Sequence, residues 1–211
     1  ELVEGEDLSQ RIDRGALAEE DAVDIIRKVL AREEPVTSDG EFYPLPYEGP
    51  NAWGMGKPLK PIVHPLRADV PIFIGAEGPK NVTQTAEIAD GWLPLYYSPY
   101  RQEVYADQIS AAKPGFEVAP LVLVNIHDDV EEALYPVKAM LGFYIGGMGS
   151  RARNFHKELM ARMGFPDEAE QIQTLFFEGK RDEAIAAVLR SGTAGPMVGT
   201  IAVLRRLIKL L

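Results

Sequence analysis

The sequence predicts an α/β fold with parallel strands, and three stretches of the chain lead to this prediction. Residues 71–95, PIFIGAEGPKNVTQTAEIADGWLPL, read as a buried strand, a glycine-containing turn, a helix and a second strand. The runs at 71–74 and 92–95 are apolar without alternation, as expected of strands that are covered on both faces. A third apolar run, Val118–His127, precedes two acidic residues that suit the start of another helix. Strands separated in this way pair in parallel, because a parallel connection needs a crossover.

The remaining elements follow from periodicity and from residues that start or end helices. Glu19–Ala31 carries an apolar stripe at helical spacing, with acidic residues early and basic residues late. Residues 34–60 are rich in proline and glycine, and they predict a long loop around a short hairpin, Val36–Thr37 with Phe42–Tyr43. Further helices are predicted near residues 99–111, 130–141, 151–163, 167–177, 181–190 and 200–211.

Composition narrows the class of protein and of partner. The 211 residues are 46% hydrophobic, which supplies a core, and the net charge is −10 with no large basic block. Nucleic acid and acidic membrane surfaces are therefore excluded as partners, since both require a basic footprint. The absence of cysteine excludes disulfides, thiolate metal sites and a cysteine nucleophile. No apolar run approaches the ~18 residues of a membrane span, and the acidic start of the chain does not resemble a secretory signal. We expect a cytoplasmic protein.

The turn after the first strand of the β-α-β unit is the best candidate binding site. Its two glycines permit a tight turn and close approach of a ligand, and a proline suits the first turn of the helix. A helix that starts at the carboxyl end of a strand favours anions, phosphate above all. Against this, Glu77 would repel an anion unless its carboxylate points away, and the turn could simply be a short connection. The candidate residues are Gly75, Ala76, Glu77, Gly78, Pro79, Lys80 and Asn81.

Two further residues are candidates for the substrate site. Trp53 lies in the glycine- and proline-rich loop and could stack on a planar ring, although loop tryptophans more often pack against the fold. His127 ends the third predicted strand and could donate or accept a proton there. The alternative for His127 is a partly exposed neighbour of the helix-capping pair Asp128–Asp129. Trp92 opens a buried strand and is predicted to belong to the core.

Other polar motifs favour structural roles. His64 and Arg67 lie upstream of the first strand, towards the amino-terminal face of the sheet, and suit a polar loop better than a substrate site. The segment Gly146–Asn154, GGMGSRARN, resembles an anion cradle, but arginines in the first turn of a helix oppose its dipole unless an anion is near. The three histidines lie far apart and no HExxH motif occurs, so no metal site is predicted.

Several strings of the sequence together resemble a known family. GAEGPKN followed by AEIADGW is similar to the bacterial luciferase-like monooxygenase superfamily, in particular to its actinobacterial oxidoreductases that use coenzyme F420. AVDIIRKVLAREEPVTSDGEFYPLP, GKPLKPIVHPLRADVPIFIG, VNIHDDVEEAL and YIGGMGSRARNFHKELMARMGF extend the resemblance from Ala22 to Val188. The resemblance implies a TIM-type (β/α)8 barrel, of which about three strands are recognisable here. Because such a barrel needs eight strands, we expect residues 1–211 to be a single domain, the C-terminal portion of a barrel from a longer chain. A naturally shortened relative is the alternative.

The resemblance also implies a function. It predicts an oxidoreductase that transfers a hydride between the deazaflavin coenzyme F420 and a small organic substrate, with the cofactor phosphate at Gly75–Asn81. FMN is the alternative cofactor, in a flavin-dependent monooxygenase of the same superfamily. Catalytic residues of the family come largely from earlier strands, so none is named here, and no metal is expected. The partner predicted besides the substrate is a second copy of the chain, because the sheet edges of an incomplete barrel need cover.

Two alternatives from other classes of function are also compatible with the sequence. A truncated, non-catalytic barrel would bind a flavin-like ligand or only dimerise. A different phosphate-binding barrel enzyme would share the βα turn alone, and an FMN or sugar-phosphate ligand at Gly75–Asn81 would favour it over the F420 assignment.

Overall fold

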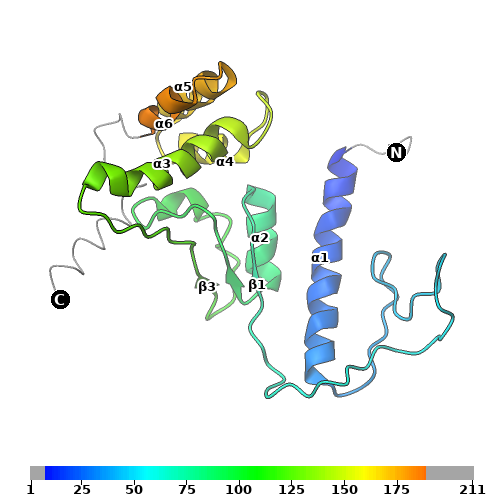
Figure 1. Ribbon diagram of the computed structural model, residues 1–211. Helices are drawn as coiled ribbons and strands as arrows, with labels where there is room; N and C mark the ends of the chain where they lie inside the picture. Colours follow the sequence, from blue (N-terminus) through cyan, green and yellow to red (C-terminus); the bar gives the residue numbers. More distant parts are fainter. Residues whose placement is uncertain (1–7, 189–211) are drawn as a thin grey trace, which may run out of the picture.

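A computed structural model describes residues 8–188 of the chain (Figure 1). Its three strands form one parallel sheet in the order β1-β2-β3. The elements in chain order are α1 (Leu8–Ala31), β1 (Phe73–Ile74), α2 (Pro79–Ile88), β2 (Gly91–Trp92), the 3-10 helix η1 (Gln102–Tyr105), β3 (Glu117–Val118), α3 (Val130–Gly147), α4 (Phe155–Arg162), α5 (Pro166–Phe177) and α6 (Arg181–Ala187).

The predicted β-α-β unit is confirmed. Phe73 pairs with Gly91 and Ile74 with Trp92 in parallel register, and α2 forms the crossover between the two strands. The indole of Trp92 is 1% exposed, so its predicted place in the core is also confirmed. Gly91 is required here for a steric reason, because a Cβ at this position would collide with the ring of Phe73. The α/β fold class with parallel strands therefore holds in the described part of the chain.

The third strand is much shorter than predicted. Only Glu117–Val118 is regular strand, whereas the sequence predicted Val118–His127. Two more backbone bonds continue the contact with β2, from Ala119 to Trp92 O at 2.9 Å and from Leu121 to Pro94 O at 3.2 Å. These bonds lie outside regular strand, because Pro94 between them has no N–H to donate to the third strand. Beyond it, the apolar side chains of Leu121, Val122, Val124 and Ile126 are exposed.

Several helix boundaries also differ from the prediction. Helix α1 begins at Leu8, eleven residues before the predicted start at Glu19, because the weakly patterned residues before Glu19 continue the same helix. The predicted helix at 99–111 is reduced to η1 and turns, since its first residues lack a side-chain cap and carry no continuous apolar stripe. The predicted helix at 200–211 lies outside the described residues. Helix α3 continues to Gly147, beyond the predicted end at residue 141, and α4 begins at Phe155 instead of residue 151. Helices α5 and α6 lie close to their predicted positions.

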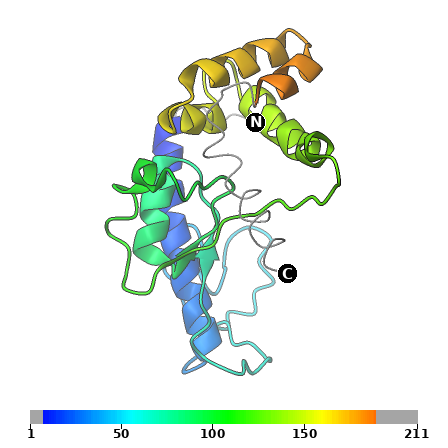
Figure 2. The ribbon, with the colours of Figure 1, turned by 90° about the vertical axis from the view of Figure 1, so that its left-hand side faces the viewer.

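The long connection between α1 and β1 forms no hairpin of the predicted kind. Its backbone bridges join Val36 to Leu59 and Ser38 to Leu45, so the strand-like residues pair with distant loop residues rather than with Phe42–Tyr43. The glycine and proline content of the intervening segment prevents a regular ladder. In Figures 1 and 2 this loop lies at one end of the molecule, and the helices α3 to α6 are gathered at the other.

One core joins the sheet to this helical group. Ala76, Val82 and Trp92 from the β-α-β unit share a buried cluster with Leu141 and Ile145 of α3 and with side chains of α4, α5 and α6. Helix α3 packs on α5 and α6, and α4 packs on α5. The helices α3 to α6 therefore pack against the buried side of the turn that follows β1, the side that carries Ala76. None of the helices in residues 8–188 is both long and apolar enough to cross a membrane.

Candidate functional site

The turn between β1 and α2 is built as the sequence predicted. Gly75 is exposed at the carboxyl end of β1, and Gly78 is the N-cap residue of α2 with φ −75° and ψ 147°. Pro79 occupies the first turn of the helix, and Lys80 and Asn81 are exposed beside it. The backbone of a helix start thus faces outwards at the carboxyl edge of the parallel sheet, where α/β folds bind anionic groups.

The underside of the turn is anchored by two hydrogen bonds. The indole Nε1 of Trp92 donates to Ala76 O at 2.8 Å, in a buried position. The backbone N–H of Leu95 donates to Glu77 Oε1, also at 2.8 Å. The Glu77 carboxylate is therefore held by the segment that follows β2. Burial raises the pKa of Glu77, although the bond from Leu95 acts in the opposite direction.

The opposite end of α2 is held by a second carboxylate. Asp90 accepts from Ile72 N at 2.9 Å and from Arg27 Nη2 at 3.1 Å, so it ties α1 to the start of β1. Burial alone would raise the pKa of Asp90, but these hydrogen bonds and the charge of Arg27 outweigh burial and hold the pKa below its usual value. This network lies at the amino ends of the strands, and it positions the β-α-β unit rather than a ligand.

The helical group reaches the turn through the start of α4. A Cβ at Gly78 would lie 3.6 Å from the ring of Phe155, so that ring packs beside the turn. The guanidinium of Arg153 lies over the same ring, 5.2 Å from its centroid. The anion cradle considered for Gly146–Asn154 is therefore adjacent to the candidate turn at Arg153. Arg151, in contrast, lies over Phe177 at 4.3 Å.

Asn154 joins α3 to α4 and holds this part of the site in place. Its side-chain oxygen accepts from His156 N and Lys157 N, both at 3.0 Å, which caps α4. Its Nδ2 donates to Tyr144 O at 3.1 Å and Ile145 O at 2.8 Å near the end of α3. The Asn154 side chain thus makes four hydrogen bonds and is 3% exposed. The sequence did not single out this residue as a cap.

The other predicted residues lie outside this turn. Trp53 is 94% exposed and does not pack against the described fold, so its stacking role stays a prediction. His127 is exposed, and its Nδ1 accepts from Asp129 N at 3.1 Å within the capping turn of α3. His64 and Arg67 are exposed in the loop before β1.

The sequence missed a cluster of polar aromatic residues beside the turn. Tyr96 follows β2, Tyr144 lies near the end of α3, and His156 lies in the first turn of α4. Their rings pack edge to face against one another. A usable signal did exist, because Tyr96 comes directly after the second strand, at the same carboxyl edge as the turn.

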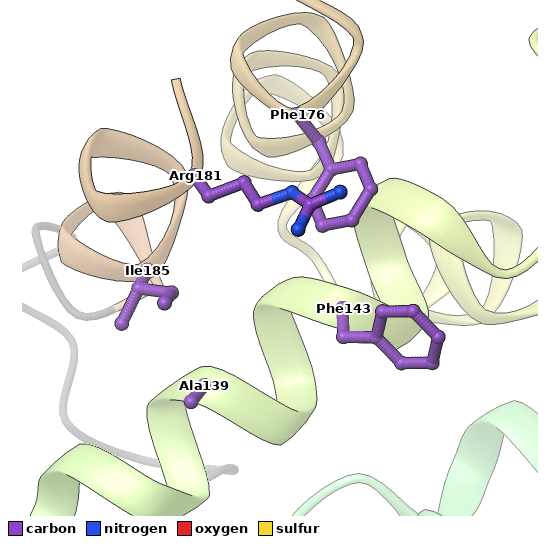
Figure 3. A pocket seen from close by; sticks show the side chains of 5 residues that line it. All are labelled: Ala139, Phe143, Phe176, Arg181 and Ile185. Atoms are coloured by element: carbon purple, nitrogen blue, oxygen red, sulfur yellow. The ribbon is translucent and has the colours of Figure 1, made fainter. Parts of the chain in front are cut away.

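A separate pocket of about 180 Å³ lies between α3, α5 and α6 (Figure 3). Ala139 and Phe143 form one wall, Ile185 another, and the guanidinium of Arg181 lies over the ring of Phe176 at 5.5 Å. The pocket shares no residue with the Gly75–Asn81 turn. In residues 8–188 no group of three or more potential metal ligands comes together.

Two named proteins are similar to this chain over more than half of its length. The chain is 45% identical over 184 residues to a Mycobacterium tuberculosis protein named "Putative coenzyme F420-dependent oxidoreductase", a match that covers 83% of this chain and 53% of the relative. It is 30% identical over 134 residues to the 5,10-methylenetetrahydromethanopterin reductase of Archaeoglobus fulgidus, covering 60% of this chain and 36% of that protein.

Among solved structures, the coenzyme F420 dependent tetrahydromethanopterin reductase of Methanopyrus kandleri matches with a TM-score of 0.63 and 22% identity. The match covers 90% of this chain and 55% of that one, and it supports the predicted fold, part of a TIM-type barrel. The chain thus spans about half the length of the Mycobacterium tuberculosis relative and of the Methanopyrus kandleri structure. The model of the luciferase-like monooxygenase family matches residues 3–208. The chain belongs to the luciferase-like monooxygenase family.

Proposed function

We propose that this chain forms the phosphate-binding part of a coenzyme F420-dependent oxidoreductase. The enzyme would transfer a hydride between F420 and a small organic substrate, and the cofactor would supply the redox chemistry. The chain's own contribution is to bind the cofactor phosphate at Gly75–Asn81 and to orient the cofactor at the carboxyl edge of the sheet. The named relative from Mycobacterium tuberculosis supports F420 over FMN as the cofactor.

The observation that carries the proposal is the exposed backbone of the turn. A Cβ at Gly75 would approach only Leu93 O, at 3.8 Å, and a Cβ at Gly78 would touch only the Phe155 ring, at 3.6 and 3.9 Å. The fold accommodates alanine at both positions, so these glycines leave room for a group that approaches the backbone. The Glu77 carboxylate already accepts from Leu95 N, and this face also presents the helix start and the exposed Lys80 and Asn81. These features fit a phosphate.

Fluorescence titration with F420 and with FMN tests the proposal on the 211-residue chain. We expect F420 to bind more tightly than FMN. Gly75→Ala and Gly78→Ala should each weaken F420 binding by about tenfold, which is about 1.4 kcal/mol, while the melting temperature stays unchanged. Gly142→Ala, at a helical glycine far from the turn in sequence, is the control and should bind F420 as the wild type does. Tighter binding of FMN than of F420 would contradict the proposal. So would an F420 affinity of both turn variants that equals that of the wild type.

Glu77 offers a second test of the same turn. Glu77→Gln keeps an oxygen that can accept from Leu95 N and removes the negative charge. We expect F420 to bind up to about fivefold more tightly, the range typical of a solvent-screened charge pair. Weaker binding would mean that the carboxylate supports the turn by its charge.

Location and assembly belong to the same proposal. A cytoplasmic homodimer is supported by the cysteine-free, acidic composition and by the exposed apolar side chains that follow β3. Light scattering after size-exclusion chromatography would test the dimer. The non-catalytic alternative predicts that neither F420 nor FMN binds to the chain.

A further inference from the structure

Three polar aromatic rings meet where the segment after β2, the end of α3 and the start of α4 come together. The ring centroids of Tyr144 and His156 lie 4.9 Å apart, those of Tyr96 and His156 5.6 Å, and those of Tyr96 and Tyr144 5.7 Å. All three pairs are close to perpendicular, which is a favoured aromatic geometry. The three rings thus contact one another by their edges and faces.

Two polar atoms of this cluster have no hydrogen-bond partner within the described residues. They are the hydroxyl oxygen of Tyr96 and Nδ1 of His156, and both are enclosed. The whole His156 residue is 9% exposed, and its backbone N–H is held by Asn154 at 3.0 Å. Buried side-chain polar atoms are hydrogen-bonded in the large majority of cases, so two unpartnered atoms in one cluster point to a missing partner.

The cluster offers hydrogen bonds without charge. Burial lowers the pKa of His156 and raises the pKa of Tyr96, so at neutral pH the imidazole and the phenol are both uncharged. The nearby carboxylate, Glu77, already accepts from Leu95 N. An anion would find no positive partner in these rings. An oxygen that accepts from the Tyr96 hydroxyl and meets the imidazole fits their chemistry.

The position of the cluster relates it to the cofactor turn. Phe155 precedes His156 in the chain, and its ring packs beside Gly78. Tyr96 and Gly78 both lie just beyond the carboxyl ends of their strands. Any group bound at the cluster would therefore lie on the same edge of the sheet as the turn proposed to bind the cofactor phosphate.

We propose that Tyr96 and His156 bind an uncharged carbonyl or hydroxyl oxygen of the organic substrate. Tyr96 is partly exposed as a residue whereas its hydroxyl oxygen is enclosed, so binding of that oxygen requires the Tyr96 side chain to turn outwards. The perpendicular rings provide an apolar aromatic wall for the carbon frame beside it. This inference rests on the proposed function and adds a substrate class to it.

Two tyrosine-to-phenylalanine variants show whether the hydroxyl of Tyr96 has a binding role or a structural role. Tyr105 is buried, and its hydroxyl donates to Tyr96 O at 2.9 Å, whereas the hydroxyl of Tyr96 has no partner in the described chain. We expect Tyr105→Phe to lower the melting temperature because it loses a hydrogen bond. Tyr96→Phe should leave the melting temperature unchanged or raise it. A clear drop for Tyr96→Phe would assign its hydroxyl a structural partner and overturn the proposal.

Binding is measured with cyclohexanol as the probe, by NMR of the His156 ring protons. In the wild type these signals should move on titration, and in Tyr96→Phe the apparent Kd should rise about three- to tenfold, the loss expected for one neutral hydrogen bond. Cyclohexanecarboxylate should bind more weakly than cyclohexanol. Static His156 signals, equal affinity in Tyr96→Phe, or preferred binding of the carboxylate would each overturn the proposal.

The titration of F420 distinguishes this failure from failure of the proposed function. If Tyr96 and His156 serve the substrate, Tyr96→Phe binds F420 with the wild-type Kd. An F420 affinity that falls with the loss of this hydroxyl would assign the cluster to the cofactor and overturn the substrate assignment. Loss of F420 binding in the wild type would contradict the proposed function alone, because the cyclohexanol titration does not depend on the cofactor.

Discussion

Replacement of Asn154 tests how the helical group is fixed beside the turn. Asn154→Ala removes the cap of α4 and the two bonds from Nδ2 to Tyr144 O and Ile145 O at 3.1 and 2.8 Å. Loss of an Asn cap costs about 1 kcal/mol. Each lost neutral hydrogen bond costs about another 1 kcal/mol. The variant should therefore be about 3 kcal/mol less stable than the wild type.

Thermal and urea unfolding measure this effect directly. For a chain of this size, 1 kcal/mol corresponds to about 2–4 °C in Tm, so Asn154→Ala should melt about 6–12 °C lower. Asn154→Ser divides the loss into its parts, since its hydroxyl can cap α4 but cannot replace the two Nδ2 donors. It should lose about 2 kcal/mol.

A matched control is Asn125, whose Nδ2 makes a single exposed bond to Ala133 O at 3.0 Å. Asn125→Ala should change stability by less than about 1 kcal/mol. The reasoning is refuted if Asn154→Ala costs no more than this control, or if the serine variant is as unstable as the alanine variant. The second result would mean that the Nδ2 bonds account for the whole effect and that the cap contributes nothing.

Two other predictions concern packing and pH. Gly146→Ala should destabilise the protein by about 1–3 kcal/mol, because its Cβ would lie 2.6 Å from Phe176 Cβ, whereas Gly142→Ala meets ordinary 3.5 Å contacts and should gain up to about 1 kcal/mol of helix propensity in urea unfolding. The lowered pKa of Asp90 stabilises the fold above the unfolded-state pKa, about 3.9, and this stability is lost as pH falls through the folded-state pKa. Asp90→Asn should therefore be less stable at pH 7, and the difference should vanish in acid unfolding; a gap that persists at low pH would contradict the role of the Arg27 pair.

The sequence predicted the β-α-β unit because its signals are local. An apolar run, two glycines and a proline at the start of a helix lie within a few residues of one another, and each favours the same structure. The orientation of Glu77 could not be predicted in this way. It depends on Leu95 N, 18 residues away in the chain, which becomes a neighbour only when the two strands pair.

The cluster of Tyr96, Tyr144 and His156 escaped prediction for the same reason. Its members come from three elements, and no spacing along the chain relates them. The length of β3 depended on a neighbouring element as well, since the regular strand ends where Pro94 offers no donor rather than where the apolar run ends. Periodicity describes what a segment can bury, whereas pairing partners decide how much of it becomes regular strand.

The glycines of this chain fall into two groups, and the division bears on function. A side chain at Gly91 would collide with Phe73, and one at Gly146 would press on Phe176, so the fold itself requires these glycines. Gly75 and Gly78 are different. Gly78 has backbone angles that any residue adopts, and a Cβ at either position would make only ordinary contacts.

The fold therefore does not explain why the turn lacks side chains at these two positions. Two acceptors of the turn already have hydrogen-bond donors within the fold. Trp92 donates to Ala76 O, and Leu95 N donates to the Glu77 carboxylate. What glycine adds is access to the backbone from the outer face, which would benefit a ligand such as the proposed cofactor. Alanine at Gly75 or Gly78 therefore separates a structural requirement for glycine from a role in cofactor binding. A loss of stability would show that the fold requires these glycines. A loss of F420 affinity alone would assign them to the cofactor.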